Sequence, residues 1–315
     1  MAVTARPRSH MIQAEAQTRI DLAACYRLVD LFGWSDLINT RITARVPGPQ
    51  NHFLINRFGM LYDEITASSL VKIDVDGNKV EPSDDEVNSG GFAIPSTIHM
   101  ARPDINCVIH THTVAGCAVS MQKDGLLPLN QHALQVIGDV AYHDYEGTGR
   151  SLEERERFLA DFGDKHIMVL RNHGLFVVGR TIPEAFIATY RMERACTMQL
   201  TFQQSGAELN PLSDAVVSAG YAKSRAGAAR GHDPNKFDWP ALLRKLNRID
   251  RTRCNGSADR GPSATIPTQA KRCLSARRGQ STADGGACPG TQTRDLGLLK
   301  TLKTATVAST PLAIW

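Results

Sequence analysis

Two short apolar runs, each leading into histidine, constrain this chain more than any other feature. The first run is VIHTHT at residues 108–113; the second is IMVL at 167–170, followed by RNHG at 171–174. Runs of this length and composition are typical of buried strands. On an extended strand, His110 and His112 project from the same face because they lie two residues apart. We therefore predict a sheet that carries imidazoles at the ends of two strands, with His173 as the third.

This histidine group predicts a metal site. A lone histidine on a strand is usually structural, but three histidines in two matched settings favour metal binding. Three neutral imidazoles suit zinc, and they suit Mn(II) or Fe(II) when oxygen ligands join them. We expect His110, His112 and His173 to hold a divalent ion, with Zn(II) as the first choice. Such an incomplete protein shell leaves a coordination position for a substrate.

Composition sets the broad class of the protein. The chain has 315 residues, of which 42% are hydrophobic and 22% are charged, and these values are ordinary for a globular protein. It contains no run of about 18 apolar residues, so we expect no membrane span. The first residues lack the apolar segment of a secretory signal. Seven cysteines form no CxxC pair, and we expect a cytoplasmic protein without a disulfide framework.

The net charge of +4 is unevenly distributed. Residues 251–315 hold ten Lys and Arg against three Asp and Glu, which leaves 26 basic against 29 acidic residues in the rest of the chain. The same stretch is rich in Gly, Ser, Thr and Ala and has no sustained hydrophobic periodicity. We predict a folded domain at 10–250 and a disordered basic tail at 251–315. One hypothesis is that the tail is a frameshifted or read-through extension. Binding to nucleic acid is disfavoured because the basic residues are scattered without stacking aromatics.

Hydrophobic periodicity outlines the secondary structure. It predicts helices at about 11–34, 92–101, 114–121, 151–162 and 181–204, and strands at 42–46, 53–55, 70–75, 108–113, 167–170 and 175–178. Capping boxes, SLEE at 151–154 and TIPE at 181–184, open two of the helices. Strands and helices do not alternate strictly, and hairpin signals separate several strands. We predict an α/β fold with an antiparallel or mixed sheet covered by helices.

Several motifs, in order along the chain, resemble the class II aldolase/adducin family. They are RPDINCVIHTH at 102–112, RNHG at 171–174 and PEAF at 183–186, while DEITASS at 63–69 and YHDYEG at 142–147 resemble its adducin-like bacterial branch. The resemblance covers roughly residues 10–250. It implies a three-layer α/β/α domain around a central, largely antiparallel sheet. It also implies a homo-oligomer, often a tetramer, that acts on a small-molecule substrate.

The family's enzymes include L-fuculose-phosphate aldolase and L-ribulose-5-phosphate 4-epimerase. The resemblance maps their three metal-binding histidines onto His110, His112 and His173. In the aldolases, a glutamate nineteen positions before the first of these histidines acts as general acid and base, and this chain has Gly91 there. Glycine cannot transfer a proton. Glu86 and Tyr142 are the candidates to replace this glutamate as the proton-transfer group. The alternative for Glu86 is that its side chain is a solvated charge in a loop.

The resemblance also implies a substrate pocket. The aldolases bind phosphate at two turns that correspond here to TRIT at 40–43 and NRFG at 56–59. Arg41 and Arg57 are either ligands of an anionic substrate or exposed loop arginines. The expected substrate-binding set is Arg41, Thr43, Asn56, Gly59, Ser89 and Gly90.

Three functions remain open at this point. The first is a metal-dependent carbon–carbon lyase of aldolase type that acts on a small oxygenated or carboxylated substrate. The second is a non-catalytic, adducin-like binding or scaffold module, which Gly91 favours. The third is a metal-dependent decarboxylase or oxygenase of aromatic or hydroxy acids.

Overall fold

A seven-stranded sheet forms the centre of the protein. The computed structural model describes residues 8–48, 51–87, 92–147, 152–227 and 232–249. The strand order is β3-β2-β1-β4-β7-β6-β5. Their bounds are β1 Arg41–Arg45, β2 Phe53–Ile55, β3 Val71–Ile73, β4 Cys107–Thr111, β5 Val140–His143, β6 Ile167–Leu170 and β7 Gly174–Gly179. All neighbours pair antiparallel except β5 and β6. The predicted largely antiparallel sheet is thus confirmed.

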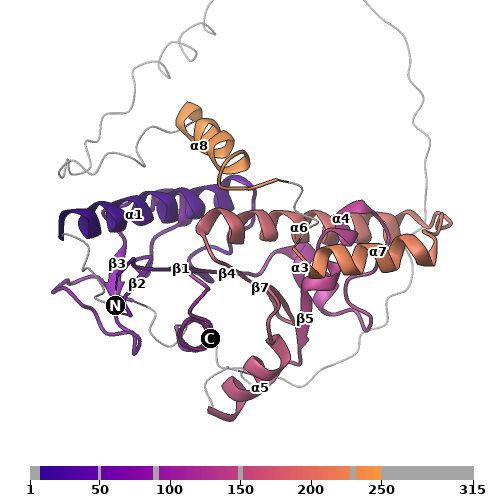
Figure 1. The fold of residues 1–315 in the computed structure, drawn as a ribbon, viewed down its shortest axis with the longest axis horizontal. Coiled ribbons are helices and arrows are strands. Elements are labelled where there is room, and N and C mark those ends of the chain that lie inside the picture. The colour runs from indigo at the N-terminus through magenta and orange to yellow at the C-terminus, as the bar shows by residue number, and fades with distance from the viewer. Residues whose placement is uncertain (1–7, 49–50, 88–91, 148–151, 228–231, 250–315) are drawn as a thin grey trace, which may run out of the picture. The chain divides into compact units, whose positions relative to one another are not determined.

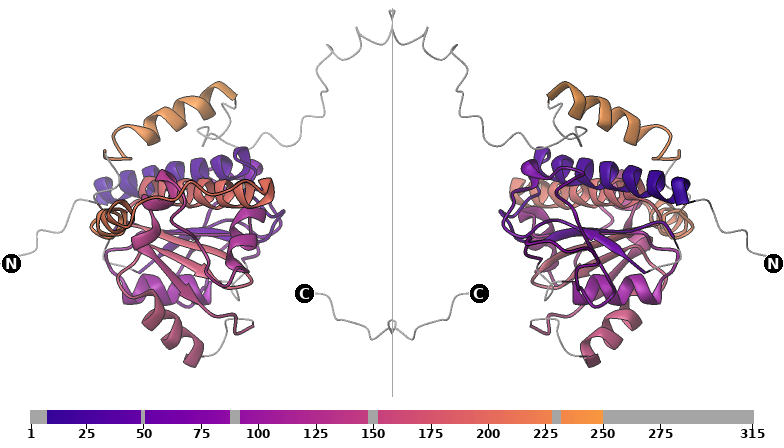
Figure 2. Two further views of the ribbon diagram at one scale, coloured as in Figure 1. Left: turned by 90° about the vertical axis from the view of Figure 1, so that its right-hand side faces the viewer. Right: turned by 90° about the vertical axis from the view of Figure 1, so that its left-hand side faces the viewer.

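Helices cover both faces of the sheet, as Figures 1 and 2 show. One face is covered by α1 (Arg8–Leu31) and α6 (Ile182–Ser205), together with α3 (Val114–Ser120). The opposite face is covered by α2 (Ala93–Ala101) and α5 (Leu152–Phe162). This is the three-layer α/β/α arrangement that the family resemblance implies.

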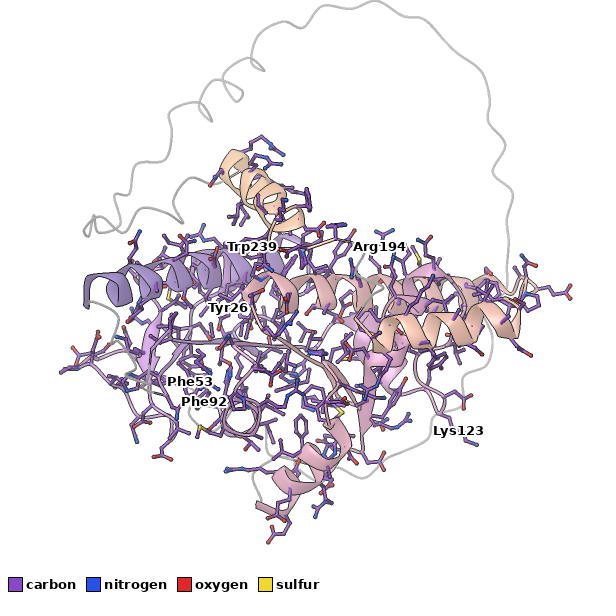
Figure 3. The ribbon with its side chains drawn as sticks, viewed as in Figure 1. Tyr26, Phe53, Phe92, Lys123, Arg194 and Trp239 are labelled. Carbon is purple, nitrogen blue, oxygen red and sulfur yellow. The ribbon has the colours of Figure 1, made fainter. Side chains whose placement is uncertain are left out.

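The alternation of side chains along β4 explains the two layers of core. Cys107 and Ile109 pack with α1 and α6, whereas Val108 packs with α2 and α5. Figure 3 places Tyr26 between α1 and the sheet, and Phe53 beside Phe92 in the other layer. Successive residues of a strand point to opposite faces, so a run that is apolar throughout fits a strand buried on both sides.

Further elements pack around α1 and α6. They are α4 (Gln131–Leu134), the 3-10 turns Tyr62–Glu64 and Ile137–Asp139, α7 (Asp214–Arg225) and α8 (Asp238–Ile249). Trp239 and Leu246 of α8 are buried in the α1–α6 layer of the core. The sequence predictions did not include β5 or α7, because β5 (VAYH) is not an uninterrupted aliphatic run like that of β6 and α7 exposes most of its surface.

The helix boundaries test the predicted capping boxes. Thr181 caps α6 by accepting a hydrogen bond from the backbone N–H of Glu184. Ser151, the predicted cap of α5, lies outside the described residues, as do residues 251–315 of the predicted tail. None of the described helices is both long enough and apolar enough to cross a membrane.

Candidate metal centre

The antiparallel pairing of β4 with β7 brings the three histidines together. His110 is the penultimate residue of β4, His112 follows the end of this strand, and His173 lies in the turn between β6 and β7. That turn needs Asn172 in the left-handed region, with φ of 57°. It also needs Gly174, because a Cβ atom there would lie 2.4 Å from the Thr111 carbonyl oxygen. Backbone geometry therefore fixes where His173 meets β4.

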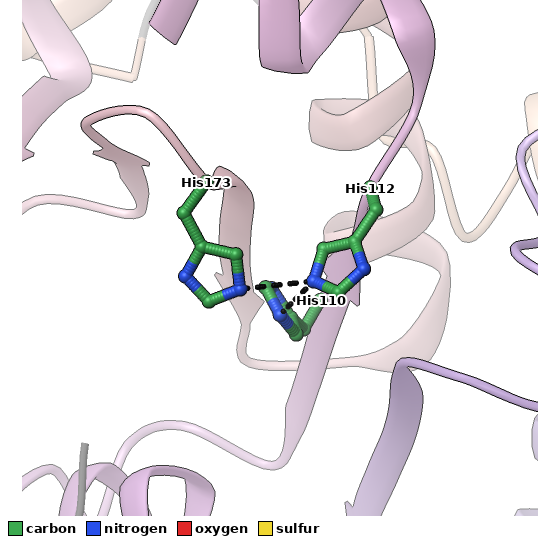
Figure 4. A group of neighbouring side chains, drawn as sticks. All are labelled: His110, His112 and His173. Carbon is green, nitrogen blue, oxygen red and sulfur yellow. Dashed lines mark hydrogen bonds between the residues drawn. The ribbon is translucent and has the colours of Figure 1, made fainter. Parts of the chain in front are cut away.

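The three imidazoles point toward one another (Figure 4). His112 Nε2 lies 3.0 Å from His110 Nε2 and 2.9 Å from His173 Nε2. All three ligand atoms lie within 4.8 Å of one another. Two nitrogens that each lie about 2.1 Å from one ion are about 3.0 Å apart at an angle of about 90°. The observed separations are close to those of nitrogens that share one metal ion.

The partners of the opposite ring nitrogens define which atoms carry protons. His110 Nδ1 lies 2.9 Å from the Leu175 carbonyl oxygen, and His112 Nδ1 lies 3.0 Å from Asp36 Oδ2. Both oxygens only accept, so each Nδ1 carries a hydrogen, and the neutral form of each ring has its lone pair at Nε2. Two lone pairs that face each other at 3.0 Å repel unless a cation lies between them. The residues present therefore fit a divalent metal ion.

Burial and neighbouring charges keep two of these ligands, His110 and His173, neutral. Burial, followed by the charges of the neighbouring histidines, holds the pKa of His110 well below its usual range. Burial, His112 and Arg41 lower the pKa of His173 from 6.5 to about 4. At neutral pH both rings carry the free lone pair that a metal needs.

Asp36 is a site residue that sequence reasoning missed. It lies in the connection between α1 and β1, 76 residues before His112, and its carboxylate orients that ring. Carboxylates of this kind fix the tautomer of a metal-binding imidazole and raise its basicity. The same connection holds Leu37 and Thr40 at positive φ, 50° and 61°, so the backbone is strained beside the site. No local pattern marks Asp36, because only the fold brings it to His112.

Glu193 is a second residue that the sequence did not reveal. It lies on α6, is 3% exposed, and accepts a hydrogen bond of 2.7 Å from Thr113 Oγ1. The Thr113 hydroxyl also caps α3 by accepting from the Gly116 N–H. Burial raises the pKa of Glu193 from 4.5 to about 7. Through its hydrogen bond with Thr113, this carboxyl group stabilises the segment that follows His112.

The predicted substrate-binding residues divide into separate groups. Arg41 lies directly opposite His110 across the β1–β4 pair. Thr43 is completely buried and bonded to His99, while Asn56 is 6% exposed and accepts from the Tyr26 hydroxyl, so neither side chain is free to contact a substrate. Gly59 lies in an open turn at φ of 89°. Ser89 and Gly90 lie outside the described residues.

The candidate proton-transfer groups are also dispersed. Gly91 lies outside the described residues, and Glu86 is exposed. The Tyr142 hydroxyl accepts a hydrogen bond of 3.0 Å from the Leu126 N–H, and its ring stacks on Arg171. Tyr145 is instead 60% exposed, and its ring centroid lies 6.1 Å from that of His173. Among the described residues, Tyr145 is thus better placed for proton transfer than Glu86 or Tyr142.

Comparisons with known proteins agree with this architecture. Residues 20–200 match the family model described as Class II Aldolase and Adducin N-terminal domain. A Pseudomonas aeruginosa protein, whose name assigns it provisionally to the class 2 aldolases, is 47% identical over 241 residues; the match covers 75% of this chain and 91% of that protein. Mouse alpha-adducin is 42% identical over 252 residues, which cover 75% of this chain but only 34% of the adducin.

A solved structure extends the agreement to three dimensions. The crystal structure of an aldolase II superfamily protein from Pseudomonas syringae is 46% identical in sequence and superimposes with a TM-score of 0.71. That match covers 77% of this chain and 96% of the other. The family model spans all seven strands of the sheet and all three histidines. The chain therefore belongs to the class II aldolase and adducin N-terminal domain family.

Proposed function

We propose that this protein is a divalent-metal-dependent carbon–carbon lyase of aldolase type. The observation that carries the proposal is the convergence of three imidazole nitrogens: His112 Nε2 lies 3.0 Å from His110 Nε2 and 2.9 Å from His173 Nε2. Their orienting partners, the Leu175 carbonyl and Asp36, hold each ring in the tautomer that binds a metal. Three ring nitrogens gathered within 4.8 Å of one another, on rings oriented from outside the cluster, support a metal site over a purely structural role.

The residues of the site have distinct tasks in such a reaction. His110, His112 and His173 would hold the ion, with Zn(II) the first expectation and Mn(II) or Fe(II) the alternatives. When bound, the ion would supply Lewis-acid polarisation of a substrate carbonyl. Asp36 keeps His112 in its productive orientation. Among the residues that the structure describes, Tyr145 is the group we propose to deliver or accept a proton at the exposed side of His173.

The substrate belongs to a broader class than the sugar phosphates of the family's aldolases. Gly91 stands where those enzymes carry their catalytic glutamate, so the proton-transfer half of the reaction must use other residues. We propose a small oxygenated or carboxylated substrate. We also propose a cytoplasmic homo-oligomer, with a tetramer as the expectation from the family.

Two other functions have support of their own. Similarity to alpha-adducin, together with Gly91, favours a non-catalytic binding or scaffold module. A metal centre without the aldolase glutamate also fits a decarboxylase or oxygenase of aromatic or hydroxy acids. These alternatives differ in whether metal is bound and in which substrates turn over.

Elemental analysis of protein purified without an immobilised-metal step tests the proposal. We expect about one divalent ion per chain in the wild type, and loss of the ion in His110→Ala and His173→Ala. His52→Ala, at a histidine outside the cluster, is the matched control and should keep the ion. Wild-type protein without metal would leave only the scaffold function. Bound metal with turnover of aromatic or hydroxy acids, but without carbon–carbon cleavage, would move the assignment to a decarboxylase or oxygenase.

A further inference from the structure

Arg41 is a mostly buried cation without an anionic partner. Among the described residues, no carboxylate forms an ion pair with it, and its Nε is completely buried without a hydrogen-bond partner. Burial is the main cause that lowers the pKa of this guanidinium, and the hydroxyls of Tyr62 and Tyr26 act on that pKa in the opposite direction. A buried charge with no partner is costly unless something else neutralises it.

The position of Arg41 places this charge beside the histidine cluster. Arg41 and His110 are directly opposed in the β1–β4 pair, so both side chains leave the sheet on the same face, with Cβ atoms about 5 Å apart. The charge of Arg41 depresses the pKa of both His110 and His173, which places the guanidinium near two of the three imidazoles. The cation thus faces the site and not only bulk solvent.

Neighbouring arginines show what the usual arrangement looks like. Arg57, the other candidate for anion binding, is about half exposed, and its Nε lies 3.0 Å from Asp85 Oδ1. Arg45, at the other end of β1, donates to the His99 carbonyl and to Asn51 Oδ1. Arg41 differs from both in having no such partner within the described part of the chain. Of the guanidinium groups of Arg41, Arg45 and Arg57, that of Arg41 is therefore the one available to bind an anionic ligand.

From this geometry we propose that Arg41 binds the carboxylate of the substrate, and that the substrate is a small 2-oxo or 2-hydroxy acid. This inference rests on the proposed metal-dependent function. Guanidinium binds a carboxylate through two parallel hydrogen bonds. Because Arg41 lies directly across the strand pair from His110, a carboxylate on Arg41 leaves the adjacent oxygen of the same molecule facing the imidazoles. In a phosphorylated ketol, the anion lies several bonds farther from that oxygen.

The test measures ligand binding to the full-length protein loaded with cobalt(II), whose visible absorption reports changes at the metal. Pyruvate is the carboxylate probe, and hydroxyacetone is the uncharged probe of similar size. Arg41→Gln should weaken pyruvate binding about 10- to 100-fold, as expected for a charge-assisted bidentate contact, and change hydroxyacetone binding less than about 3-fold. Arg180→Gln, which alters an exposed arginine paired with Glu184, is the control and should bind both probes like the wild type.

The outcomes of this experiment distinguish failure of the proposed metal-dependent function from failure of the proposed role of Arg41. Cobalt that fails to bind the wild-type protein would contradict the proposed metal-dependent function. Cobalt that binds, with pyruvate affinity equal in wild type and Arg41→Gln, would overturn only the role of Arg41. Hydroxyacetone phosphate serves as a third, phosphorylated probe, and an Arg41→Gln loss confined to it would assign a phosphate in place of a carboxylate and overturn the substrate class. A loss of pyruvate binding in Arg57→Gln instead would move the contact to Arg57. Retained cobalt in Arg41→Gln, checked by elemental analysis, confirms that the variant keeps an intact site.

Discussion

The two ends of β1 lie beside two very different histidine environments. At one end, Arg41 lies opposite His110 of the histidine cluster; toward the other end, Thr43 and Arg45 contact His99 of α2. His99 is completely buried, and its two ring nitrogens lie 3.0 Å from Thr43 Oγ1 and 3.3 Å from the Ile105 carbonyl oxygen. The cluster instead points its nitrogens at one another.

The difference shows what distinguishes a structural histidine from a metal ligand. Burial lowers the pKa of His99 to about 3, and burial also lowers the pKa of His110, so protonation does not separate the two. The partners do. Both ring nitrogens of His99 contact groups outside the cluster, whereas His110 and His112 each have one such contact and turn Nε2 toward the other cluster histidines.

The largest expected effect is on metal affinity. His110→Ala removes one of three ligands, and we expect metal affinity to fall at least about 100-fold. His99→Gln should leave metal affinity within about 3-fold of the wild type, because His99 faces Thr43 and not the cluster. Titration of metal-free protein with zinc in the presence of a competing chelator measures both. Equal losses in the two variants would remove the distinction between the environments.

Acid should reveal the structural role of His99. Its pKa is 6.5 in the unfolded chain and about 3 in the folded protein. Below pH 6.5 the unfolded chain therefore binds a proton that the folded protein does not, and the free energy of unfolding falls until about pH 3. Between pH 7.5 and 4.5 this one group should remove about 2–3 kcal/mol.

Denaturant unfolding of metal-free protein at several pH values measures this effect. His99→Gln should show a shallower fall in stability over the same range, because glutamine does not titrate. A variant whose pH dependence matches that of the wild type would show that other groups dominate acid unfolding.

A smaller effect is expected at Asp36. Asp36→Asn keeps the size of the side chain but removes the charge that orients His112. We expect metal affinity to fall about 10- to 100-fold with little change in thermal stability of the metal-free protein. Asp144 is the natural control, because its side chain is 90% exposed and it faces Arg171. Asp144→Asn should bind metal like the wild type; an equal loss in both variants would argue against a specific role for Asp36.

The smallest effect compares the two arginines of β1. Arg45→Met removes hydrogen bonds to the His99 carbonyl and Asn51 and should destabilise the protein by about 1–2 kcal/mol. Arg41→Met removes a mostly buried charge without a carboxylate partner, so stability should stay equal or rise by about 1 kcal/mol. Thermal unfolding of the two variants side by side decides this. Equal destabilisation would mean that Arg41 is structural.

Much of the fold followed from local patterns. The apolar runs at 108–113 and 167–170 became β4 and β6, and the predicted helix at 181–204 became α6 with Thr181 as its cap. These elements have strong periodicity or a capping signature, so neighbouring residues suffice to predict them. The strand β5 and the helix α7 lacked such signals, because β5 ends in Tyr142 and His143 instead of continuing an aliphatic run, and α7 is largely exposed.

The candidate site shows the same division between sequence and structure. His110, His112 and His173 could be grouped from the sequence because each follows a strand-like run, and strand ends gather at the edge of a sheet. Thr43 and Asn56 were expected in the substrate pocket, but the fold turns both into buried hydrogen-bonding residues. Whether a side chain faces a site or the core depends on strand register, which the sequence does not state.

The sequence by itself therefore determined the family, the sheet and the identity of the three imidazoles, because each rests on residues that are close together or in fixed order along the chain. The tertiary structure alone decided which groups act on those imidazoles. Asp36 reaches His112 across 76 residues, and Glu193 reaches Thr113 across 80. Arg41 meets His110 only through the register of β1 with β4. Such contacts arise from packing of distant segments, and packing is the information that local pattern lacks.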